Sequence, residues 1–382
     1  MKTGIFGGTF NPPHFGHIRL CENMAKALGL DKIIVIPACV PPHKAALSLA
    51  PDEMRLEMCR AAFKAPLFEV SDIEIKRGGK SYTVETLREL KKQRPADELF
   101  FITGSDMFSS FHTWYRPEEI LSLAFLAVAS RENNFTPDFS PYTEEEKERI
   151  KFVNLPVTVL SSTEVRQKIR YKENLTGLLP QGVIDIINSN ALYDDGLYEY
   201  RKLLLTKLDK KRIFHSECVS ESACQLALQY GADKDRAAKA GLLHDIMKNA
   251  LDEEHLKYIP SMTPLEKVSR PVWHQMSAPG FLRENNIVTD EEILKAISTH
   301  TTGSAGMTKL QKVVYVADFI SADRDYPDVD TVRSLSRTSL EKAILYTAKY
   351  TIDKMVSLCK PVHPLTVDCY NEMTLLLNDE RK

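Results

Sequence analysis

Two histidines, His14 and His17, follow a glycine turn close to the amino terminus. The short run Gly4–Phe6 predicts a buried strand, and Gly7-Gly8 lets the backbone after it approach a ligand closely. Apolar residues spaced along 18–28 predict a helix that begins just after His17. Free N–H groups and the positive dipole end favour an anion at a helix N-terminus, and two imidazoles add further donors. This arrangement predicts chemistry on a phosphate.

Three later stretches carry residue types that bind phosphates and nucleotides. Ser161-Ser-Thr-Glu-Val-Arg166 places hydroxyls at a predicted helix start, together with an arginine. Pro41-Pro-His-Lys44 follows a predicted strand, so that Lys44 can reach a phosphate. Gly104-Ser-Asp106 follows another strand, and Trp114 offers a face on which a ring can stack. An N-cap, an exposed lysine or a core tryptophan would explain each stretch singly, so the prediction depends on their occurring together with the histidines.

The glycine turn matches neither the Gly-x-Gly-x-x-Gly spacing of dinucleotide-binding folds nor the P-loop. The string from Gly7 to His17, with His-x-Gly-His at its end, closely resembles the nucleotidyltransferase superfamily of adenylyl- and cytidylyltransferases. Ser81-Tyr-Thr-Val-Glu-Thr86 narrows the resemblance to the nicotinate-mononucleotide adenylyltransferases. Asn11 stands where that family usually has aspartate, which keeps the hydrogen-bonding shape and removes a charge.

This resemblance implies transfer of an adenylyl group from ATP, bound with Mg²⁺, to nicotinate mononucleotide, giving deamido-NAD and pyrophosphate. The acceptor phosphate is already an anionic nucleophile, so the enzyme must align it and stabilise the departing pyrophosphate. The resemblance assigns catalysis to His14, His17, Lys44 and Arg166. It assigns nucleotide binding to Gly7, Gly8, Thr9, Phe10, Gly104, Asp106, Ser161, Ser162 and Thr163, and binding of nicotinate mononucleotide to Tyr82, Thr86 and Trp114.

A second set of reactive residues lies in the carboxyl-terminal half: His215, His244, Asp245, His274, His300 and Asp318. Imidazoles and carboxylates without a thiolate suit divalent iron, manganese or zinc. His244-Asp245 occurs within Gly241-Leu-Leu-His-Asp-Ile-Met-Lys248, a segment that predicts a mostly buried helix. Buried polar groups require a partner, and a metal ion is one that satisfies both residues.

The order of these residues resembles the HD-domain phosphohydrolases, and most closely the bacterial symmetrical dinucleoside tetraphosphatases, which cleave diadenosine tetraphosphate into two ADP. Supporting stretches are residues 296–303, 315–324 and 362–367. By this resemblance His215, His244, Asp245 and Asp318 would bind one ion, and His274 and His300 the other, with Asp245 bridging the two. Iron is expected ahead of manganese and zinc. Asp245 and Lys248 would be catalytic, and Lys248 and Arg324 would contact phosphate.

The elements that must position these residues change character near residue 195. Before it, predicted strands (4–6, 32–37, 68–75, 98–103, 124–130 and 157–160) alternate with predicted helices (18–28, 52–63 and 81–92). Such alternation predicts an α/β fold, a doubly wound parallel sheet that binds ligands at the carboxyl ends of its strands. After it, predicted helices cover 213–231, 234–249, 290–302, 308–322 and 338–358, which predicts an all-α domain. We therefore expect an adenylyltransferase domain at 1–195 and an HD hydrolase domain at 196–382.

Composition restricts the classes of partner. The 382-residue chain has a formal net charge of −2 and no long basic stretch, which argues against a nucleic-acid polymer as ligand. The seven cysteines lack Cys-x-x-Cys spacing, no signal peptide is recognised, and the longest apolar run, 120–129, is too short to span a membrane. A bifunctional cytoplasmic enzyme acting on ATP, nicotinate mononucleotide and diadenosine tetraphosphate is expected.

Two alternatives remain at the level of sequence. The first keeps the enzyme classes and changes the substrates: pantetheine-phosphate or cytidylyl transfer in the first half, and hydrolysis of guanosine polyphosphates or cyclic nucleotides in the second. The second is a nucleotide-sensing regulator in which one half is inactive.

Overall fold

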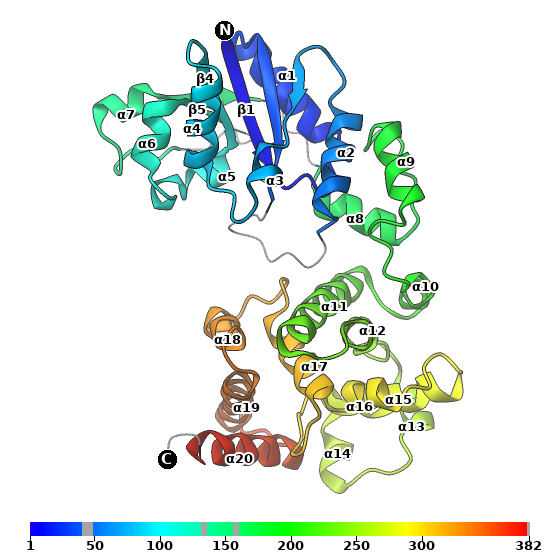
Figure 1. The fold of residues 1–382 in the computed structure, drawn as a ribbon. Helices are drawn as coiled ribbons and strands as arrows, with labels where there is room; N and C mark the ends of the chain where they lie inside the picture. Colours follow the sequence, from blue (N-terminus) through cyan, green and yellow to red (C-terminus); the bar gives the residue numbers. More distant parts are fainter. Residues whose placement is uncertain (40–48, 131–135, 156–159, 380–382) are drawn as a thin grey trace. The chain divides into compact units, whose positions relative to one another are not determined.

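Contacts within the chain divide it into two compact units, Met1–Asp195 and Gly196–Lys382 (Figure 1). The computed structural model describes residues 1–39, 49–130, 136–155 and 160–379. Among these residues, no helix is both long enough and apolar enough to cross a membrane.

The described strands of the first unit form one parallel sheet in the order β3-β2-β1-β4-β5-β6. The strands are β1 (Lys2–Gly8), β2 (Lys32–Pro37), β3 (Phe68–Val70), β4 (Glu98–Gly104), β5 (Phe125–Ser130) and β6 (Ile150–Asn154). β1 lies between β2 and β4, with Ile5 beside both Ile34 and Phe101. The chain order reverses between β1 and β4, so the carboxyl ends of these strands border the crevice where such folds bind ligands.

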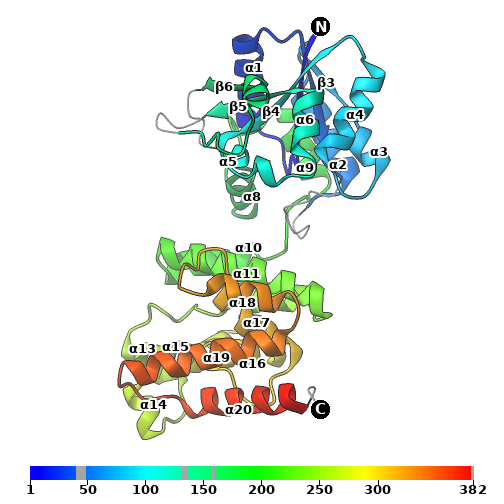
Figure 2. The same cartoon turned by 90° about the vertical axis from the view of Figure 1, so that its left-hand side faces the viewer.

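Helices cover both faces of the sheet (Figures 1 and 2). They are α1 (Phe15–Leu28), α2 (Asp52–Ala62), α3 (Ile73–Arg77), α4 (Thr83–Gln93), α5 (Ser105–Phe108), the 3₁₀ helix η1 (Phe111–Thr113), α6 (Pro117–Leu123), α7 (Glu144–Glu148), α8 (Ser162–Arg170) and α9 (Gln181–Ser189). Alternate residues of β2 serve opposite faces: Ile33 and Val35 pack with α1, α2, α8 and α9, whereas Ile34 and Ile36 pack with α3, α4 and α6. The predicted doubly wound α/β fold is confirmed.

Several predicted element boundaries in this unit are wrong. The strand expected over 68–75 ends at Val70, because Asp72 precedes α3 and the Ser71 hydroxyl accepts a hydrogen bond from Ile73 N at 3.4 Å. Ser81 does not cap α4. Tyr82 precedes that helix, and the Ser81 hydroxyl accepts from Cys39 N at 3.0 Å. The strand expected over 157–160 falls largely outside the described residues, and β6 had not been predicted.

The described part of the second unit is entirely helical, which confirms its predicted class. Its helices are α10 (Tyr198–Lys207), α11 (Lys210–Tyr230), α12 (Lys234–Leu243), α13 (Asp252–Tyr258), α14 (Pro264–Val268), the 3₁₀ helix η2 (Arg270–Val272), α15 (Trp273–Glu284), α16 (Glu291–Thr299), α17 (Lys309–Ile320), α18 (Val329–Ser336), α19 (Leu340–Ser357) and α20 (Pro364–Asp379). α11, α12, α16 and α17 enclose a shared apolar core, to which Val219, Leu243, Ile297 and Val314 belong.

α12 ends earlier than its apolar pattern predicted. The helix expected over 234–249 stops at Leu243, and the chain continues in turns. Ile246 N donates to Leu243 O and Lys248 N to Asp245 O, at 3.0 and 2.8 Å. These bonds span three residues and tighten the backbone after the helix. His244 and Asp245 therefore stand at the end of α12, and not along its side.

Candidate active sites

The turn after β1 is shaped by its packing against Phe10. A Cβ on Gly8 would lie 3.0 Å from the Phe10 ring, so the ring leaves no room for a side chain there. Phe10 has a positive φ of 47°, and its ring is buried and packs edge-on against His17 at 5.2 Å. The buried ring of Phe10 therefore supports His17 from within the core.

His14 and His17 stand together at the start of α1. Their rings stack with centroids 3.7 Å apart. His14 N donates to His17 Nδ1 at 3.2 Å, so a neutral His17 carries its proton on Nε2 and can donate from there. A Cβ on Gly16 would lie 2.9 Å from His14 Nδ1, which explains the glycine between the histidines.

The start of α8 is joined to the same turn. Ser161 caps the helix by accepting from Glu164 N at 3.1 Å, while the Ser162 hydroxyl donates to Pro12 O at 3.0 Å. Arg166 Nη1 donates to Asn11 O at 2.9 Å, and its Nη2 lies 3.3 Å from the Thr163 hydroxyl. Two helix N-termini thus meet at one turn, and both favour anions.

A buried arginine, Arg55 of α2, ties this region together and was missed by the sequence analysis. Its guanidinium donates to Thr9 O at 2.8 Å, Ala50 O at 3.1 Å and Cys39 O at 3.2 Å, and it pairs with Asp52 at 2.5 Å. The residue is fully buried. Nothing in the sequence distinguishes Arg55 from other helical arginines, which are usually exposed.

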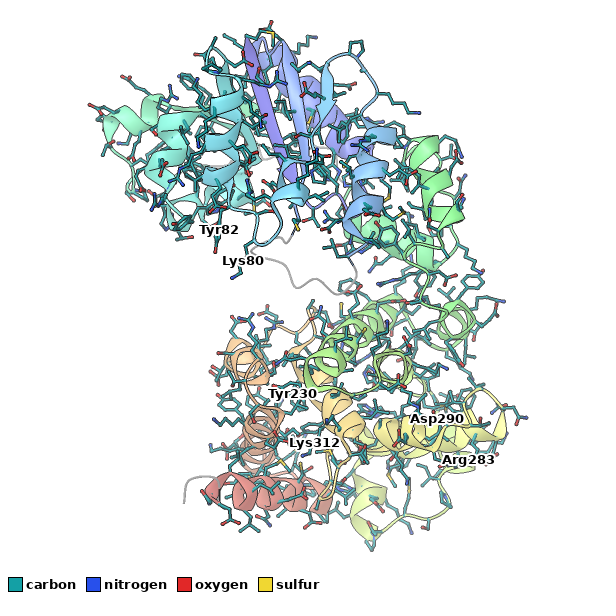
Figure 3. All side chains as sticks on the ribbon, in the orientation of Figure 1. Lys80, Tyr82, Tyr230, Arg283, Asp290 and Lys312 are labelled. Atoms are coloured by element: carbon teal, nitrogen blue, oxygen red, sulfur yellow. The ribbon has the colours of Figure 1, made fainter. Side chains whose placement is uncertain are left out.

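The carboxyl end of β4 supplies Gly104, and the exposed Asp106 follows in α5. Trp114 packs edge-on against Phe101 at 6.1 Å, so it is part of an aromatic cluster at this edge. Tyr82 (Figure 3) precedes α4 and contacts Tyr115. Lys44 lies outside the described residues.

The Thr86 hydroxyl is already hydrogen-bonded to other residues of the protein. The Thr86 side chain is buried, and its hydroxyl donates to Glu74 at 2.6 Å and accepts from Arg77 at 2.9 Å.

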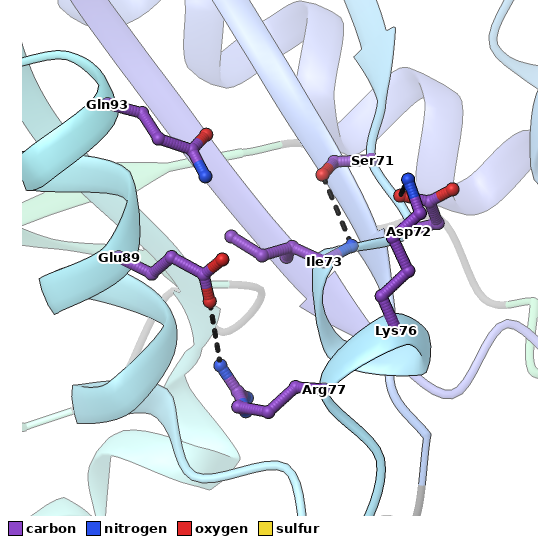
Figure 4. Close-up of a pocket in the computed structure, with 7 residues that line it drawn as sticks. All are labelled: Ser71, Asp72, Ile73, Lys76, Arg77, Glu89 and Gln93. Atoms are coloured by element: carbon purple, nitrogen blue, oxygen red, sulfur yellow. Dashed lines mark hydrogen bonds and ion pairs between the residues drawn. The ribbon is translucent and has the colours of Figure 1, made fainter.

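A cavity of about 470 Å³ lies elsewhere, between α3 and α4 (Figure 4). Its lining residues are Ser71, Asp72, Ile73, Lys76, Arg77, Glu89 and Gln93. Lys76 pairs with Asp72 at 3.1 Å and Arg77 with Glu89 at 3.7 Å, so its charges compensate one another. None of the predicted site residues that the structure describes lines it.

In the second unit, helices far apart in the sequence bring six buried donors together. We call His215 (α11), His244 and Asp245 (after α12), His274 (α15), His300 (after α16) and Asp318 (α17) the metal-donor cluster. Ligand atoms of His215, His244 and Asp318 lie within 4.8 Å of one another, as do those of His244, Asp245 and His300. His244 belongs to both groupings.

The Nδ1 atoms of three of these four histidines lie beside acceptors. His244 Nδ1 lies 2.6 Å from Gly241 O, His300 Nδ1 lies 2.7 Å from Ile297 O, and His215 Nδ1 lies 2.8 Å from Asp323 Oδ2. An Nδ1–H that donates to such an acceptor leaves Nε2 to bind a metal, which is the usual arrangement of metal-binding histidines.

The inner nitrogens face one another. His215 Nε2 and His244 Nε2 are 3.3 Å apart, and His274 Nε2 and His300 Nε2 are 3.0 Å apart. Asp245 Oδ1 lies 3.1 Å from His274 Nε2, and this buried oxygen has no hydrogen-bond partner within the described residues. Converging imidazole nitrogens and carboxylate oxygens are the donors that divalent metal ions prefer, so these residues fit such ions.

Burial keeps most of these ligands in the form that binds metal. It lowers the pKa of His244 to about 3 and that of His274 to about 4. Burial also disfavours protonation of His215, but hydrogen bonds to Asp318 and Asp323 outweigh it and raise its pKa to about 9. For Asp323, burial is outweighed by hydrogen bonds from His215 and Ser321, which lower its pKa to about 2. Asp323 is therefore an anion that holds His215 in place.

The two halves of the chain match two different families of known proteins. Residues 5–168 match the cytidylyltransferase-like family, and residues 212–323 match the HD domain. Over 213 residues, the chain is 37% identical to a Geobacter metallireducens protein named "Probable nicotinate-nucleotide adenylyltransferase", covering 50% of this chain and 98% of that protein. A Clostridium tetani protein of the same name is 38% identical over 202 residues, again covering 50% of this chain and 98% of the relative.

The chain belongs, through its amino-terminal half, to the nicotinate-nucleotide adenylyltransferase family. This family member also carries an HD domain in its second half. Among solved structures, a Clostridium acetobutylicum protein described as a predicted HD superfamily hydrolase involved in NAD metabolism is 28% identical, with a TM-score of 0.45, covering 48% of this chain and 97% of that one.

In the second unit, sequence reasoning missed two residues that contact the predicted metal ligands, Asp323 beside His215 and Arg212 beside Asp245. Asp323 lies within the 315–324 stretch, directly before Arg324, and was not singled out. Arg212 was also missed, although it precedes His215 by three residues and so faces the same side of α11. Of the predicted phosphate contacts, Lys248 Nζ lies 3.1 Å from His274 Nε2, and Arg324 pairs with Asp318.

Proposed function

We propose that the first unit transfers the adenylyl group of ATP to nicotinate mononucleotide, giving deamido-NAD and pyrophosphate. Support comes from membership of the family and from one geometric observation. The starts of α1 and α8, which carry His14, His17 and Arg166, meet at the turn after β1. Phosphates bound there would face two helix N-termini together with imidazole and guanidinium donors.

In this proposal the protein aligns its substrates and stabilises charge. His17 donates from Nε2 to the phosphate that gains negative charge, and Arg166 with Lys44 binds the departing pyrophosphate. Mg²⁺ arrives with ATP. Tyr82, Thr86 and Trp114 bind the nicotinate mononucleotide. A panel of acceptors tests this assignment: nicotinate mononucleotide should be adenylylated in preference to pantetheine phosphate, and preferential use of CTP or of another acceptor would overturn it.

For the second unit we propose metal-dependent hydrolysis of diadenosine tetraphosphate into two ADP. The observation that carries the proposal is the metal-donor cluster, with its nitrogens and carboxylates oriented inward. Two divalent ions bound there would activate water and clamp a phosphate group. Asp245 would contact both ions, and Lys248 and Arg324 would bind the phosphate chain.

Product analysis after removal and replacement of the metal tests the second activity. Chelation should abolish hydrolysis, and Fe²⁺, Mn²⁺ or Zn²⁺ supplied separately would identify the ion that restores it. Symmetrical cleavage yields ADP as the sole nucleotide product, whereas AMP with ATP would contradict the proposal. Undiminished hydrolysis after complete metal removal would also contradict it.

A further inference from the structure

Basic side chains lie against the acids of the metal-donor cluster. Arg212 Nη1 is 3.0 Å from Asp245 Oδ2, and Lys248 Nζ is 3.5 Å from the other oxygen of Asp245. Arg324 pairs with the other acid of the cluster, Asp318. A buried carboxylate requires compensation of its charge, and these cations supply it.

Arg212 has fewer partners than the other two cations. Arg324 also donates from Nε to Asp318 O at 2.8 Å, and Lys248 Nζ also lies 3.1 Å from His274 Nε2. Exposure does not distinguish the two arginines, whose side chains are 35% exposed in Arg212 and 36% exposed in Arg324. Within the described residues, the Arg212 guanidinium contacts a single acid, Asp245, through Nη1. Nε and Nη2 therefore remain for another partner.

The guanidinium of Arg212 lies beside the metal-donor cluster, where a ligand of the metal ions would bind. This residue lies in the first turn of α11, one turn before His215, and its backbone N–H is satisfied by Asp209 at 3.0 Å. Its planar, permanently charged guanidinium suits a phosphate, which it can bind through two parallel hydrogen bonds.

We propose that Arg212 is a substrate-binding residue that exchanges Asp245 for a phosphate of the substrate when divalent ions occupy the cluster. A metal ion bound by Asp245 takes over its charge compensation and repels the nearby guanidinium. The released side chain then meets the anionic chain of a polyphosphate ester. This inference rests on the hydrolase activity proposed above and adds a residue that recognises the polyphosphate.

A competing explanation is that Arg212 permanently positions Asp245. The two explanations differ in the sign of their effect on metal binding. Removing a cation that competes with the metal should leave metal affinity unchanged or increase it. Removing a group that positions a ligand should decrease it.

The test uses the full chain with Arg212→Gln, Arg212→Lys and the control Arg283→Gln. Arg283 (Figure 3), on α15, is half exposed and pairs with Glu291 at 2.8 Å, and neither residue belongs to the cluster. Calorimetry gives the Mn²⁺ affinity of the metal-stripped chain, and then the affinity of the Mn²⁺-loaded chain for inorganic triphosphate. Any binding by the first unit is common to all variants, so differences report on Arg212.

For Arg212→Gln we expect unchanged or higher Mn²⁺ affinity and triphosphate affinity reduced about tenfold to a hundredfold. The triphosphate affinity of Arg212→Lys should lie between those of the unmodified chain and Arg212→Gln, because lysine keeps the positive charge but cannot form two parallel hydrogen bonds. If Arg212→Gln fails to fold, the lysine variant decides the question. Lower Mn²⁺ affinity, or unchanged triphosphate affinity, would overturn the proposal. If the unmodified chain cleaves no diadenosine tetraphosphate, the proposed hydrolase activity fails separately, while these binding measurements still decide the role of Arg212.

Discussion

The Tyr193 hydroxyl donates a hydrogen bond to Asn11 Oδ1 at 2.8 Å, although 182 positions separate the two residues. The same oxygen accepts from Ala50 N at 2.9 Å. Burial raises the pKa of Tyr193, so its hydroxyl stays protonated and remains a donor at neutral pH. The end of the first unit is thereby joined to the turn that precedes the two histidines.

Tyr193→Phe should destabilise the first unit by about 1 kcal/mol, because one buried hydrogen bond is lost while the ring is retained. Thermal unfolding followed by calorimetry measures this change.

Asn11→Asp is the companion variant: its carboxylate can accept hydrogen bonds from both the Tyr193 hydroxyl and Ala50 N, so adenylyl transfer should stay within about a fewfold of the unmodified chain. A large loss of activity in Asn11→Asp would show that the amide nitrogen of Asn11 is also required.

His17→Ala should reduce adenylyl transfer by roughly 10²–10³, since one donor to the transferring phosphate is removed. Steady-state kinetics with ATP and nicotinate mononucleotide give the change, and ATP binding should persist. Hydrolysis by the second unit serves as an internal control and should be unaffected. Turnover close to that of the unmodified enzyme would mean that the site has been misplaced.

Asp245→Asn should remove at least one metal ion and abolish hydrolysis of diadenosine tetraphosphate, because a neutral amide is a poor bridging ligand. Metal content of the purified protein and hydrolysis are measured together. Adenylyl transfer should remain, since its proposed residues all lie in the first unit. Full retention of metal would refute the bridging role, and loss of both activities would indicate that the two halves are coupled.

Asp323→Asn should weaken metal binding about tenfold to a hundredfold, because His215 loses the anionic acceptor that orients its ring. Titration of the metal-stripped chain with Mn²⁺ measures the effect without reference to activity. Asp325→Asn is the matched control, an exposed aspartate two residues away. Equal metal affinity in both variants would show that Asp323 does not position His215.

Fragments 1–195 and 196–382 should each fold and unfold cooperatively, since each unit has its own apolar core. Circular dichroism and thermal unfolding of each fragment check this. A first fragment shortened to 1–190 should be less stable, because it lacks Tyr193. If either fragment is soluble only in the presence of the other, the two units do not fold independently.

The sequence by itself determined the fold class, and it named the candidate residues of both proposed sites. Strand and helix alternation is a local pattern, and it predicted the parallel sheet because apolar periodicity reflects which side of an element is buried. The motifs around His14, His17 and Ser161 were recognisable because a helix start binds phosphate through adjacent residues. The predicted ends of strands and helices were wrong where a serine hydroxyl accepts a hydrogen bond from a backbone N–H, as at Ser71 and Ser81.

Only the tertiary structure decided which partners these residues have. Ser162 reaches Pro12 across 150 positions, and His215 meets Asp323 across 108. Arg55 and Arg212 are both arginines on helices, yet one is fully buried against backbone carbonyls and the other stands partly exposed beside Asp245. Burial and pairing depend on the proximity of segments that are distant in sequence. For this reason the family resemblance could name candidate ligands, but not the groups that hold them.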